Sequence, residues 1–375
     1  MIDVENTGPG AQPLRIALNP LAEKSEYTQA EAQTISRKFA ENALAEISQW
    51  RGYQLSPMVS LNDLARRLGL GRLLYKDESA RLGQGSFKIL GGAYAATVRL
   101  RERPKGERVT LCCATDGNHG RSVAYAAARA GFPCFVYMHN RASRAKAAAI
   151  EALGAKVVWV EGTYDDSIRH ARDAAEKEGW LLIADTSEDE ADPTTRLVMQ
   201  GYGVMVLEIL QQMAGEAPAT HVFLQGGVGG LAAGVAGVFA DMFGKQRPRM
   251  IVVEPHSAAC LFESALHCAP ASVGGDLVTA MDMLSAGEAS PVAWNVLKRR
   301  ADVFVTIGDD AAIGAARLLS TPAAGFAGLN VGISGAAGLA GLVEVLRSSE
   351  LASALELDHT ARVLVFGTEA GTGGQ

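Results

Sequence analysis

The feature that most constrains this chain is a regular alternation of short apolar strands and helices. Cys134–Met138 and Lys156–Val160 are largely apolar segments, and Arg141–Leu153 and Tyr164–Glu178 follow them with helical patterns. Strands that are apolar on both faces and separated by helices are typical of a parallel sheet that helices cover on both sides. The sequence therefore predicts an α/β fold.

The alternation occurs in two blocks, which predict two open, twisted, mostly parallel sheets covered by helices. The first block interrupts the second, so we expect a small α/β domain at 90–205 inserted into a large domain made of 1–89 and 206–375. The first 50 residues or so are polar, and we expect them to form an irregular arm with a helical stretch near Glu31–Gln49.

Composition excludes several classes of function. The length of 375 residues and the 48% hydrophobic content suit two domains of ordinary size. The net charge of -6 argues against a nucleic-acid surface, and the apolar stretch at 226–243 is too rich in glycine and alanine for a membrane span. The start of the chain has no secretory signal pattern, and the five cysteines contain no C-x-x-C pair. We therefore expect a cytoplasmic protein without a metal site.

Lys88 is the first candidate for chemistry. It lies at a loop-to-helix junction in the segment Gly85–Tyr94, between an aromatic residue and a run rich in small residues. A lysine that forms a Schiff base must approach a flat cofactor closely, and small neighbours allow this. The alternative is an ordinary solvated lysine near a helix N-terminus.

A glycine-rich loop at 226–230 is the second candidate. It follows an apolar strand and precedes a helix, so its N–H groups and the helix N-terminus together favour a phosphate. Gly227-x-Gly229-x-x-Ala232, followed by Glu254 at the end of the next strand, also fits a dinucleotide-binding fingerprint. A tight structural turn is the third interpretation.

Three further motifs follow the ends of predicted strands, where open α/β sheets bind ligands. The first runs from Thr115 to Arg121 and could also be a helix-capping cluster. Asp185 could be a second base, an amine-binding carboxylate or a turn residue. Thr368 could meet a buried ring nitrogen or simply end its strand.

Taken together and in this order, these motifs resemble the tryptophan-synthase-β-like pyridoxal phosphate enzymes, known as fold type II, and within them the diaminopropionate ammonia-lyases. The resemblance spans about residues 50 to 370. It is carried by Lys76-Asp77-Glu78-Ser79, Ser86-Phe87-Lys88-Ile89-Leu90-Gly91-Gly92, Thr115-Asp116-Gly117-Asn118-His119-Gly120-Arg121, Met199-Gln200-Gly201-Tyr202, the 226–230 loop, Gly287-Glu288-x-Ser290-Pro291-x-Ala293-Trp294, Ser334-Gly335-Ala336 and Thr368-Glu369.

The resemblance implies a role for each matching residue. Lys88 would carry pyridoxal phosphate as a Schiff base and act as the base on L-substrates, whereas Asp116 would be the base on D-substrates. Asn118 would bind the ring hydroxyl and Thr368 the ring nitrogen. The implied phosphate and remaining cofactor contacts are Phe87, Gly226, Gly227, Val228, Gly229 and Gly230. The implied substrate contacts are Ser86, Thr115, Asp116, His119 and Asp185.

The reaction implied by the resemblance is the α,β-elimination of 2,3-diaminopropionate, as the D- or L-isomer, to pyruvate and ammonia by a homodimer. This chain departs from the family pattern in the acidic segment 188–193, at Ile333 and in the alanine-rich region 320–327. These departures leave open a serine or threonine dehydratase or another lyase of β-substituted amino acids. A nicotinamide-dependent dehydrogenase and a catalytically silent pyridoxal phosphate protein are the alternatives from other classes.

Overall fold

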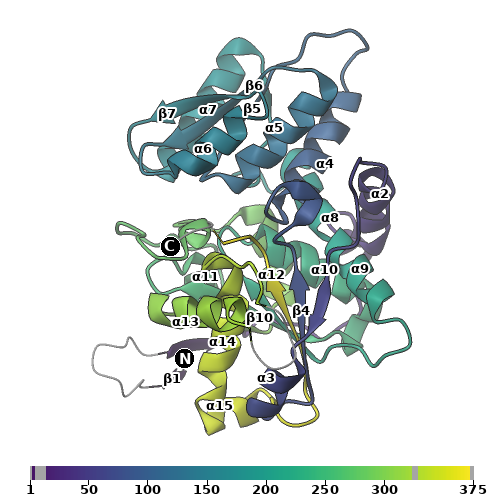
Figure 1. Cartoon of the computed structure of the whole chain (residues 1–375), viewed down its shortest axis with the longest axis vertical. Helices are drawn as coiled ribbons and strands as arrows, with labels where there is room; N and C mark the ends of the chain where they lie inside the picture. Colours follow the sequence, from purple (N-terminus) through teal and green to yellow (C-terminus); the bar gives the residue numbers. More distant parts are fainter. Residues whose placement is uncertain (1, 5–13, 323–327, 372–375) are drawn as a thin grey trace.

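The computed structural model describes residues 2–4, 14–322 and 328–371, which form two β-sheets with helices on both faces (Figure 1). The smaller sheet has the strand order β7-β6-β5-β8, and each pair of neighbouring strands is parallel. Its strands are β5 (Leu111–Ala114), β6 (Cys134–His139), β7 (Lys156–Val160) and β8 (Leu181–Leu182).

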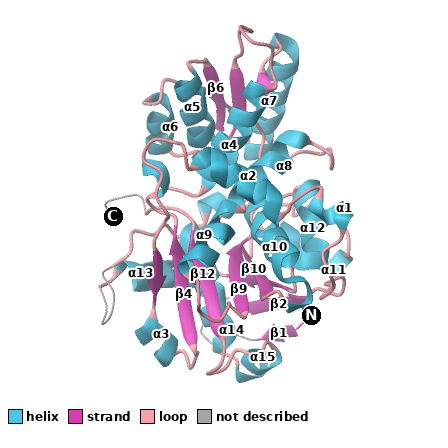
Figure 2. Ribbon diagram, turned by 90° about the vertical axis from the view of Figure 1, so that its right-hand side faces the viewer, coloured by secondary structure: helices cyan, strands magenta, loops and turns pink. Residues whose placement is uncertain are grey.

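The larger sheet has the strand order β1-β2-β11-β10-β9-β12-β4-β3 (Figure 2). The run from β11 to β4 is parallel, whereas β2 and β3 pair with it in the antiparallel direction. This arrangement confirms the predicted fold class. The strands are β1 (Ile2–Val4), β2 (Leu14–Leu18), β3 (Met58–Ser60), β4 (Arg72–Asp77), β9 (His221–Gln225), β10 (Arg249–Pro255), β11 (Val303–Ile307) and β12 (Arg362–Gly367).

Helices connect these strands and cover the sheets. None in the described ranges is long and apolar enough to cross a membrane. They are α1 (Gln29–Ala32), α2 (Arg37–Ile47), α3 (Asn62–Arg67), α4 (Lys88–Arg101), α5 (Asn118–Ala130), α6 (Arg144–Glu151), α7 (Tyr164–Glu178), α8 (Pro193–Tyr202), α9 (Val204–Gln212), α10 (Gly230–Phe243), α11 (Cys260–His267), α12 (Pro291–Arg300), α13 (Asp309–Ser320), α14 (Ala337–Leu346) and α15 (Ser349–Ala354), with short 3-10 turns η1 (Arg81–Gly83), η2 (Gly244–Gln246), η3 (Asp282–Leu284) and η4 (Ser334–Ala336).

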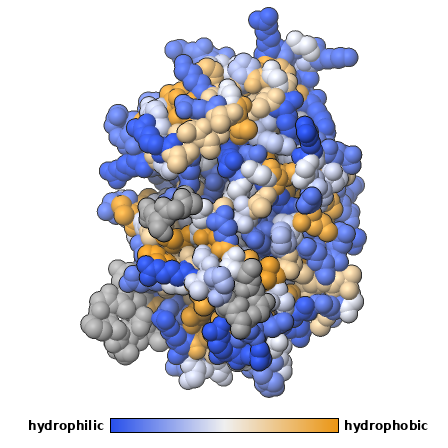
Figure 3. All heavy atoms as spheres, in the orientation of Figure 1, coloured by the Kyte–Doolittle hydropathy of each residue, from blue (hydrophilic) through white to orange (hydrophobic). Residues whose placement is uncertain are grey.

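The central strands are buried on both faces, which explains their continuous apolar sequences. Val222, Phe223 and Leu224 of β9 and Val252 and Val253 of β10 are completely buried. On the face drawn in Figure 3, polar side chains cover most of the surface and apolar ones form separate patches. The apolar residues of the strands therefore lie in the core, as the periodicity predicted.

The prediction of an irregular arm before residue 50 was wrong in part. Leu14–Leu18 forms β2, which pairs with β11 and extends the large sheet. Leu14, Ile16 and Ala17 are buried, whereas Leu18 at the end of the strand is exposed. A strand of five residues is fixed by its partner, because so short a segment has little conformational preference of its own. The predicted helical stretch at 31–49 corresponds to α1 and α2.

All strands of the small sheet lie between residues 111 and 182, and all strands of the large sheet lie outside this range. This agrees with an inserted unit, although the boundaries at residues 89 and 205 stay predictions.

Glycines let helices α4 and α8, which lie near these boundaries, approach each other closely. A side chain at Gly91 of α4 would collide with the Tyr202 ring, and one at Gly201 of α8 would collide with the carbonyl of Leu90. The close approach of α4 and α8 thus requires glycine at both positions.

A buried ionic cluster ties β4 to α9. The Glu208 carboxylate accepts hydrogen bonds from Lys76 Nζ at 2.9 Å and from Arg81 Nη2 at 2.6 Å. All three side chains are almost fully buried. A buried charge that loses its partner is costly, because water cannot replace the lost interaction.

We expect Glu208→Gln to lower the free energy of unfolding by about 3–5 kcal/mol, because it leaves two buried cations with less counter-charge. The control is Glu41→Gln, which removes the exposed ion pair between Arg37 and Glu41. That change should cost only about 0.3–0.5 kcal/mol. Urea denaturation followed by circular dichroism measures both values, and similar losses for the two variants would contradict the assignment.

Candidate active site

The polar motifs at the strand ends meet in one pocket between the two sheets. Most of the predicted site residues line it, whereas Ser86 and Gly229 are not among its lining residues. The predicted residues that line the pocket are Phe87, Lys88, Thr115, Asp116, Asn118, His119, Asp185, Gly226, Gly227, Val228, Gly230 and Thr368.

Lys88 is held in the pocket by pairing between two distant segments. The Phe87 N–H donates to the Thr368 carbonyl at 3.1 Å, and the Ala370 N–H donates to the Gly85 carbonyl at 2.9 Å. Ser86 forms an antiparallel bridge with Glu369 and is buried, so its contribution is to this pairing. Lys88 is the first residue of α4. The pairing therefore places the lysine beside the end of β12.

Lys88 and Asp185 form an ion pair across the pocket, with Nζ 2.7 Å from Oδ2. Burial acts to lower the pKa of Lys88, but the negative charge and hydrogen bond of Asp185 outweigh it and raise that pKa. Burial likewise acts to raise the pKa of Asp185, but the charges of His119 and Lys88 outweigh burial and lower that pKa. Both groups are therefore charged at neutral pH.

The glycine loop has the geometry of an anion site. Gly227 and Gly229 have φ angles of 66° and 97°, which favour glycine, and the loop leads directly into α10. The Gly226 N–H already donates to the Val253 carbonyl at 2.9 Å, so it is not free for a phosphate. The N–H groups of Gly227–Gly230 and the N-terminus of α10 remain for that role.

The motif at 287–294 contacts this loop through a hydrogen bond and through close packing. The Ser290 N–H donates to the Val228 carbonyl at 2.9 Å. A Cβ atom at Gly229 would lie 3.0 Å from Cβ of Ala293, so the loop packs tightly on α12. This motif contributed to the resemblance, and the contacts give it a physical role in shaping the glycine loop at 226–230.

Glu254 does not face the pocket, and this removes the nicotinamide interpretation. Its carboxylate accepts hydrogen bonds from the N–H groups of Leu261 and Phe262 at 2.9 and 2.7 Å, at the start of α11. Burial raises its pKa to about 8. A carboxylate enclosed in this way cannot bind a ribose hydroxyl in the pocket, so the dinucleotide fingerprint was misleading.

The motif after β5 contributes both capping and pocket-facing groups. The capping interpretation expected Asp116 or Asn118 to be the cap, which was wrong, because the N-cap of α5 is Gly117 without a side-chain cap. The Thr115 hydroxyl instead accepts hydrogen bonds from the N–H groups of Gly117 and Gly120 at 2.8 and 3.0 Å. His119 donates from Nε2 to the Ile183 carbonyl at 2.8 Å, and burial lowers its pKa. Burial also raises the pKa of Asp116, which His139 counteracts through a hydrogen bond. The motif therefore presents an imidazole and a carboxyl group to the pocket.

Several pocket residues escaped the sequence reasoning. The Asn118 amide donates to Glu369 Oε2 at 2.7 Å. Tyr202 is not a lining residue, but the centroid of its ring lies 4.7 Å from that of Phe87, which lines the pocket. Glu369 and Tyr202 stand in motifs that supported the resemblance, so their motif membership was the available signal. The other unassigned lining residues include Tyr164, Gln225 and Ser334.

The acidic segment that departs from the family pattern does not line this pocket. Glu188 pairs with Arg172 at 2.7 Å, Glu190 accepts from Asn295 at 2.7 Å, and Asp192 caps α8. Ile333 is also absent from the lining residues. Part of the third departure, residues 323–327, lies outside the described residues. The first two departures therefore add no lining residue to the pocket around Lys88, although Glu188 lines an adjoining pocket that shares Tyr164 and Val228 with it.

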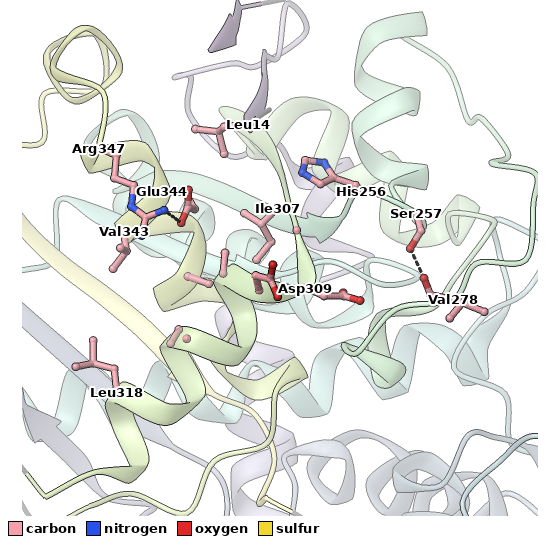
Figure 4. Close-up of a pocket in the computed structure, with 16 residues that line it drawn as sticks. Leu14, His256, Ser257, Val278, Ile307, Asp309, Leu318, Val343, Glu344 and Arg347 are labelled. Carbon is pink, nitrogen blue, oxygen red and sulfur yellow. Dashed lines mark hydrogen bonds and ion pairs between the residues drawn. The ribbon is translucent and has the colours of Figure 1, made fainter. Parts of the chain in front are cut away.

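Another pocket lies on the large unit beside α13 and α14 (Figure 4). Its labelled residues include Ile307, Asp309 and an ion pair between Glu344 and Arg347. It contains none of the predicted site residues. Within the described ranges, no group of three or more potential metal ligands occurs.

The pocket around Lys88 fits pyridoxal phosphate. The adjacent N–H groups of the glycine loop match a phosphate, and a lysine amine in the same pocket matches an aldehyde. Gln225 Nε2 donates to the carbonyls of Gly335 and Phe366, and these two bonds fix the orientation of the amide. The buried Oε1 of the same amide has no hydrogen-bond partner among the described residues. Such an acceptor can serve a polar ligand.

Comparisons with known proteins agree with this site. The model of the pyridoxal-phosphate dependent enzyme family matches residues 50–368. The diaminopropionate ammonia-lyase of Escherichia coli is 36% identical over 341 residues, covering 86% of this chain and 85% of the relative. That of Salmonella typhimurium is 35% identical over 351 residues, covering 85% and 86%.

A solved structure extends the similarity to the fold. It is the crystal structure of the Escherichia coli diaminopropionate ammonia-lyase in complex with an aminoacrylate-PLP azomethine reaction intermediate. It superposes with a TM-score of 0.89 at 32% identity and covers 97% of this chain and 95% of that chain. The chain therefore belongs to the pyridoxal-phosphate dependent enzyme family, and within it to the diaminopropionate ammonia-lyases.

Proposed function

We propose that this enzyme catalyses the α,β-elimination of 2,3-diaminopropionate, converting one substrate and one water to pyruvate and two molecules of ammonia. The observation that carries this proposal is the pocket in which Lys88 meets the two carboxyl groups of Asp116 and Asp185. The similarity to diaminopropionate ammonia-lyases along most of the chain supports the same substrate.

The proposed cofactor contacts combine the lining of the pocket with the roles that the family resemblance implies. The N–H groups of Gly227–Gly230 would bind the phosphate, and Phe87 lies beside Lys88 at the cofactor site. Lys88 would hold the cofactor covalently, Asn118 would face the ring hydroxyl and Thr368 the ring nitrogen. When bound, pyridoxal phosphate supplies an electron sink that stabilises negative charge at Cα.

The side chains of this protein would move the protons and bind the substrate. Asp116 would take the Cα proton of the D-isomer, and Lys88 that of the L-isomer. Asp185, which holds the Lys88 ammonium, would bind the β-ammonium of the substrate by the same charge pairing once Lys88 is engaged. The bond from Cβ to nitrogen then breaks with both electrons on nitrogen, which leaves as ammonia. Thr115 and His119 line the same pocket and would contact the substrate.

A substrate panel tests this function. The purified holoenzyme is given D- and L-2,3-diaminopropionate, serine and threonine, and the oxo acid and ammonia are measured. We expect diaminopropionate to have the highest kcat/KM. A higher value for serine or threonine would make the protein a dehydratase, and no turnover of any member would favour a silent binding protein.

We propose in addition that the protein is a homodimer of the reducing cytoplasm, with residues 90–205 as the inserted domain. The resemblance supports the dimer. All five cysteines are free in the structure, and the exposed one is Cys268. This agrees with a reducing compartment. Light scattering on the holoenzyme measures the assembly state.

Lys88→Ala should abolish turnover of both isomers and the absorbance band of the bound cofactor, because no other side chain would hold it covalently. The fold should persist, as judged by circular dichroism. The control is Lys177→Ala, which changes an exposed lysine on α7 and should retain full activity. Normal turnover by the Lys88 variant would refute the assignment.

Asp116→Asn should lower kcat/KM for the D-isomer by about 10²–10⁴-fold, the usual contribution of a general base. The L-isomer should lose much less, because its proton goes to Lys88. Asp173→Asn, an exposed position on α7, is the matched control. Equal losses for the two isomers would disprove the division between two bases.

Asp185→Asn should shift the pH dependence of cofactor loading. Asp185 raises the pKa of Lys88, so its removal lets burial lower that pKa. The free amine, which is the form that reacts with an aldehyde, then exists at lower pH. We expect the rate of apoenzyme reconstitution, followed by absorbance, to reach its plateau at a lower pH than in the wild type. An unchanged pH profile would show that the ion pair does not control Lys88.

A further inference from the structure

We propose that His139 is a positioning residue that holds Asp116 in the orientation needed to accept the Cα proton of D-configured substrates. This inference rests on the proposed base role of Asp116. His139 is the last residue of β6, and Asp116 follows the end of β5. No sequence motif pointed to it.

The parallel pairing of β5 and β6 brings these two residues together. Ala114 is paired with Tyr137, and the Thr115 N–H continues the ladder to the Tyr137 carbonyl at 3.0 Å. The register therefore places residue 116 beside residue 139 at the carboxyl edge of the sheet. His139 Nε2 lies 2.7 Å from Asp116 Oδ1. The contact is thus a consequence of strand register as well as of side-chain rotamers.

The geometry also indicates where the proton lies. An ionised carboxylate can only accept a hydrogen bond, so Nε2 must carry a proton when Asp116 is ready to act as a base. His139 Nδ1 is buried and has no partner among the described residues. The neutral tautomer with the proton on Nε2 suits this site. In that tautomer Nδ1 carries no proton, so no N–H group is buried without an acceptor. The bond from Nε2 occupies Oδ1 and leaves Oδ2 for the substrate proton.

Other charges act on Asp116 from the elements around it. Lys146 of α6 and Asp282 of η3 pair with each other at 2.9 Å, and they have opposite effects on the pKa of Asp116. The charge of Asp116 also raises the pKa values of two further groups, Lys88 and Tyr164. Among the described residues, His139 is the side chain that hydrogen-bonds to Asp116. It therefore provides the direct restraint on this carboxylate, which burial would otherwise protonate more readily.

The test measures exchange of the Cα proton of D- and L-alanine for deuterium by the holoenzyme. Alanine has no leaving group, so the assay reports the base and not the elimination. His139→Leu should slow exchange of D-alanine by about 10–100-fold near neutral pH, as expected for a misplaced catalytic group. L-Alanine should exchange at the wild-type rate. The acid limb of the D-alanine profile should move to higher pH, because the hydrogen bond that lowers the pKa of Asp116 is lost.

Two comparisons separate positioning from a loss of structure. His139→Gln keeps an N–H donor at a similar distance from the backbone, so it should restore most of the D-alanine exchange. In an Asp116→Asn background, His139→Leu should cause little further loss, because its effect passes through Asp116. His170→Leu, at an exposed position on α7, is the control and should exchange both isomers normally.

The inference is overturned if His139→Leu slows exchange of D- and L-alanine equally or keeps the wild-type pH profile. It is also overturned if His139→Gln does not restore the exchange of D-alanine. It is also overturned if the wild-type holoenzyme exchanges no D-alanine. Ammonia release from diaminopropionate is measured separately. His139-dependent exchange without ammonia release would support this role of His139 and refute the proposed substrate.

Discussion

The ion pair between Lys88 and Asp185 joins the two sheets at the centre of the site. Asp185 follows β8 of the small sheet, and Lys88 is anchored to the end of β12 of the large sheet through the pairing of 85–87 with 368–370. The two charges stabilise each other in a largely buried pocket, and each raises the cost of removing the other. The arrangement of the pocket therefore depends on the relative position of the two sheets.

Close packing of glycines makes this relative position possible. Gly91 and Gly201 allow α4 and α8 to approach each other, and Gly229 allows the glycine loop at 226–230 to pack on Ala293 of α12. These contacts use the absence of a side chain, not the conformational freedom of glycine alone. The motifs around Lys88 and around the loop thus combine groups that face the ligand with groups that hold the backbone in place.

The sequence allowed prediction of those parts of the site that follow from local pattern. Lys88, the 226–230 loop and Asp185 could be found because each follows or begins a recognisable strand or helix. His139 could not, because its role depends on the register between β5 and β6 and not on its neighbours in sequence. Glu254 was misinterpreted for the same kind of reason, since only the position of α11 shows where its carboxylate points. The short strand β2 could not be predicted either, because it depends on its pairing with the distant strand β11.

In the proposed reaction, the two carboxyl groups of the pocket divide cation binding and proton transfer between them. Asp185 lies beside Lys88 and His119, so its pKa falls and it stays ionised. Burial raises the pKa of Asp116, and the bond from His139 limits that rise. Groups whose environments move their pKa values in opposite directions commonly divide binding and proton transfer between them. Asp185 is thereby suited to hold an ammonium group, and Asp116 is suited to take a proton from carbon and to release it again.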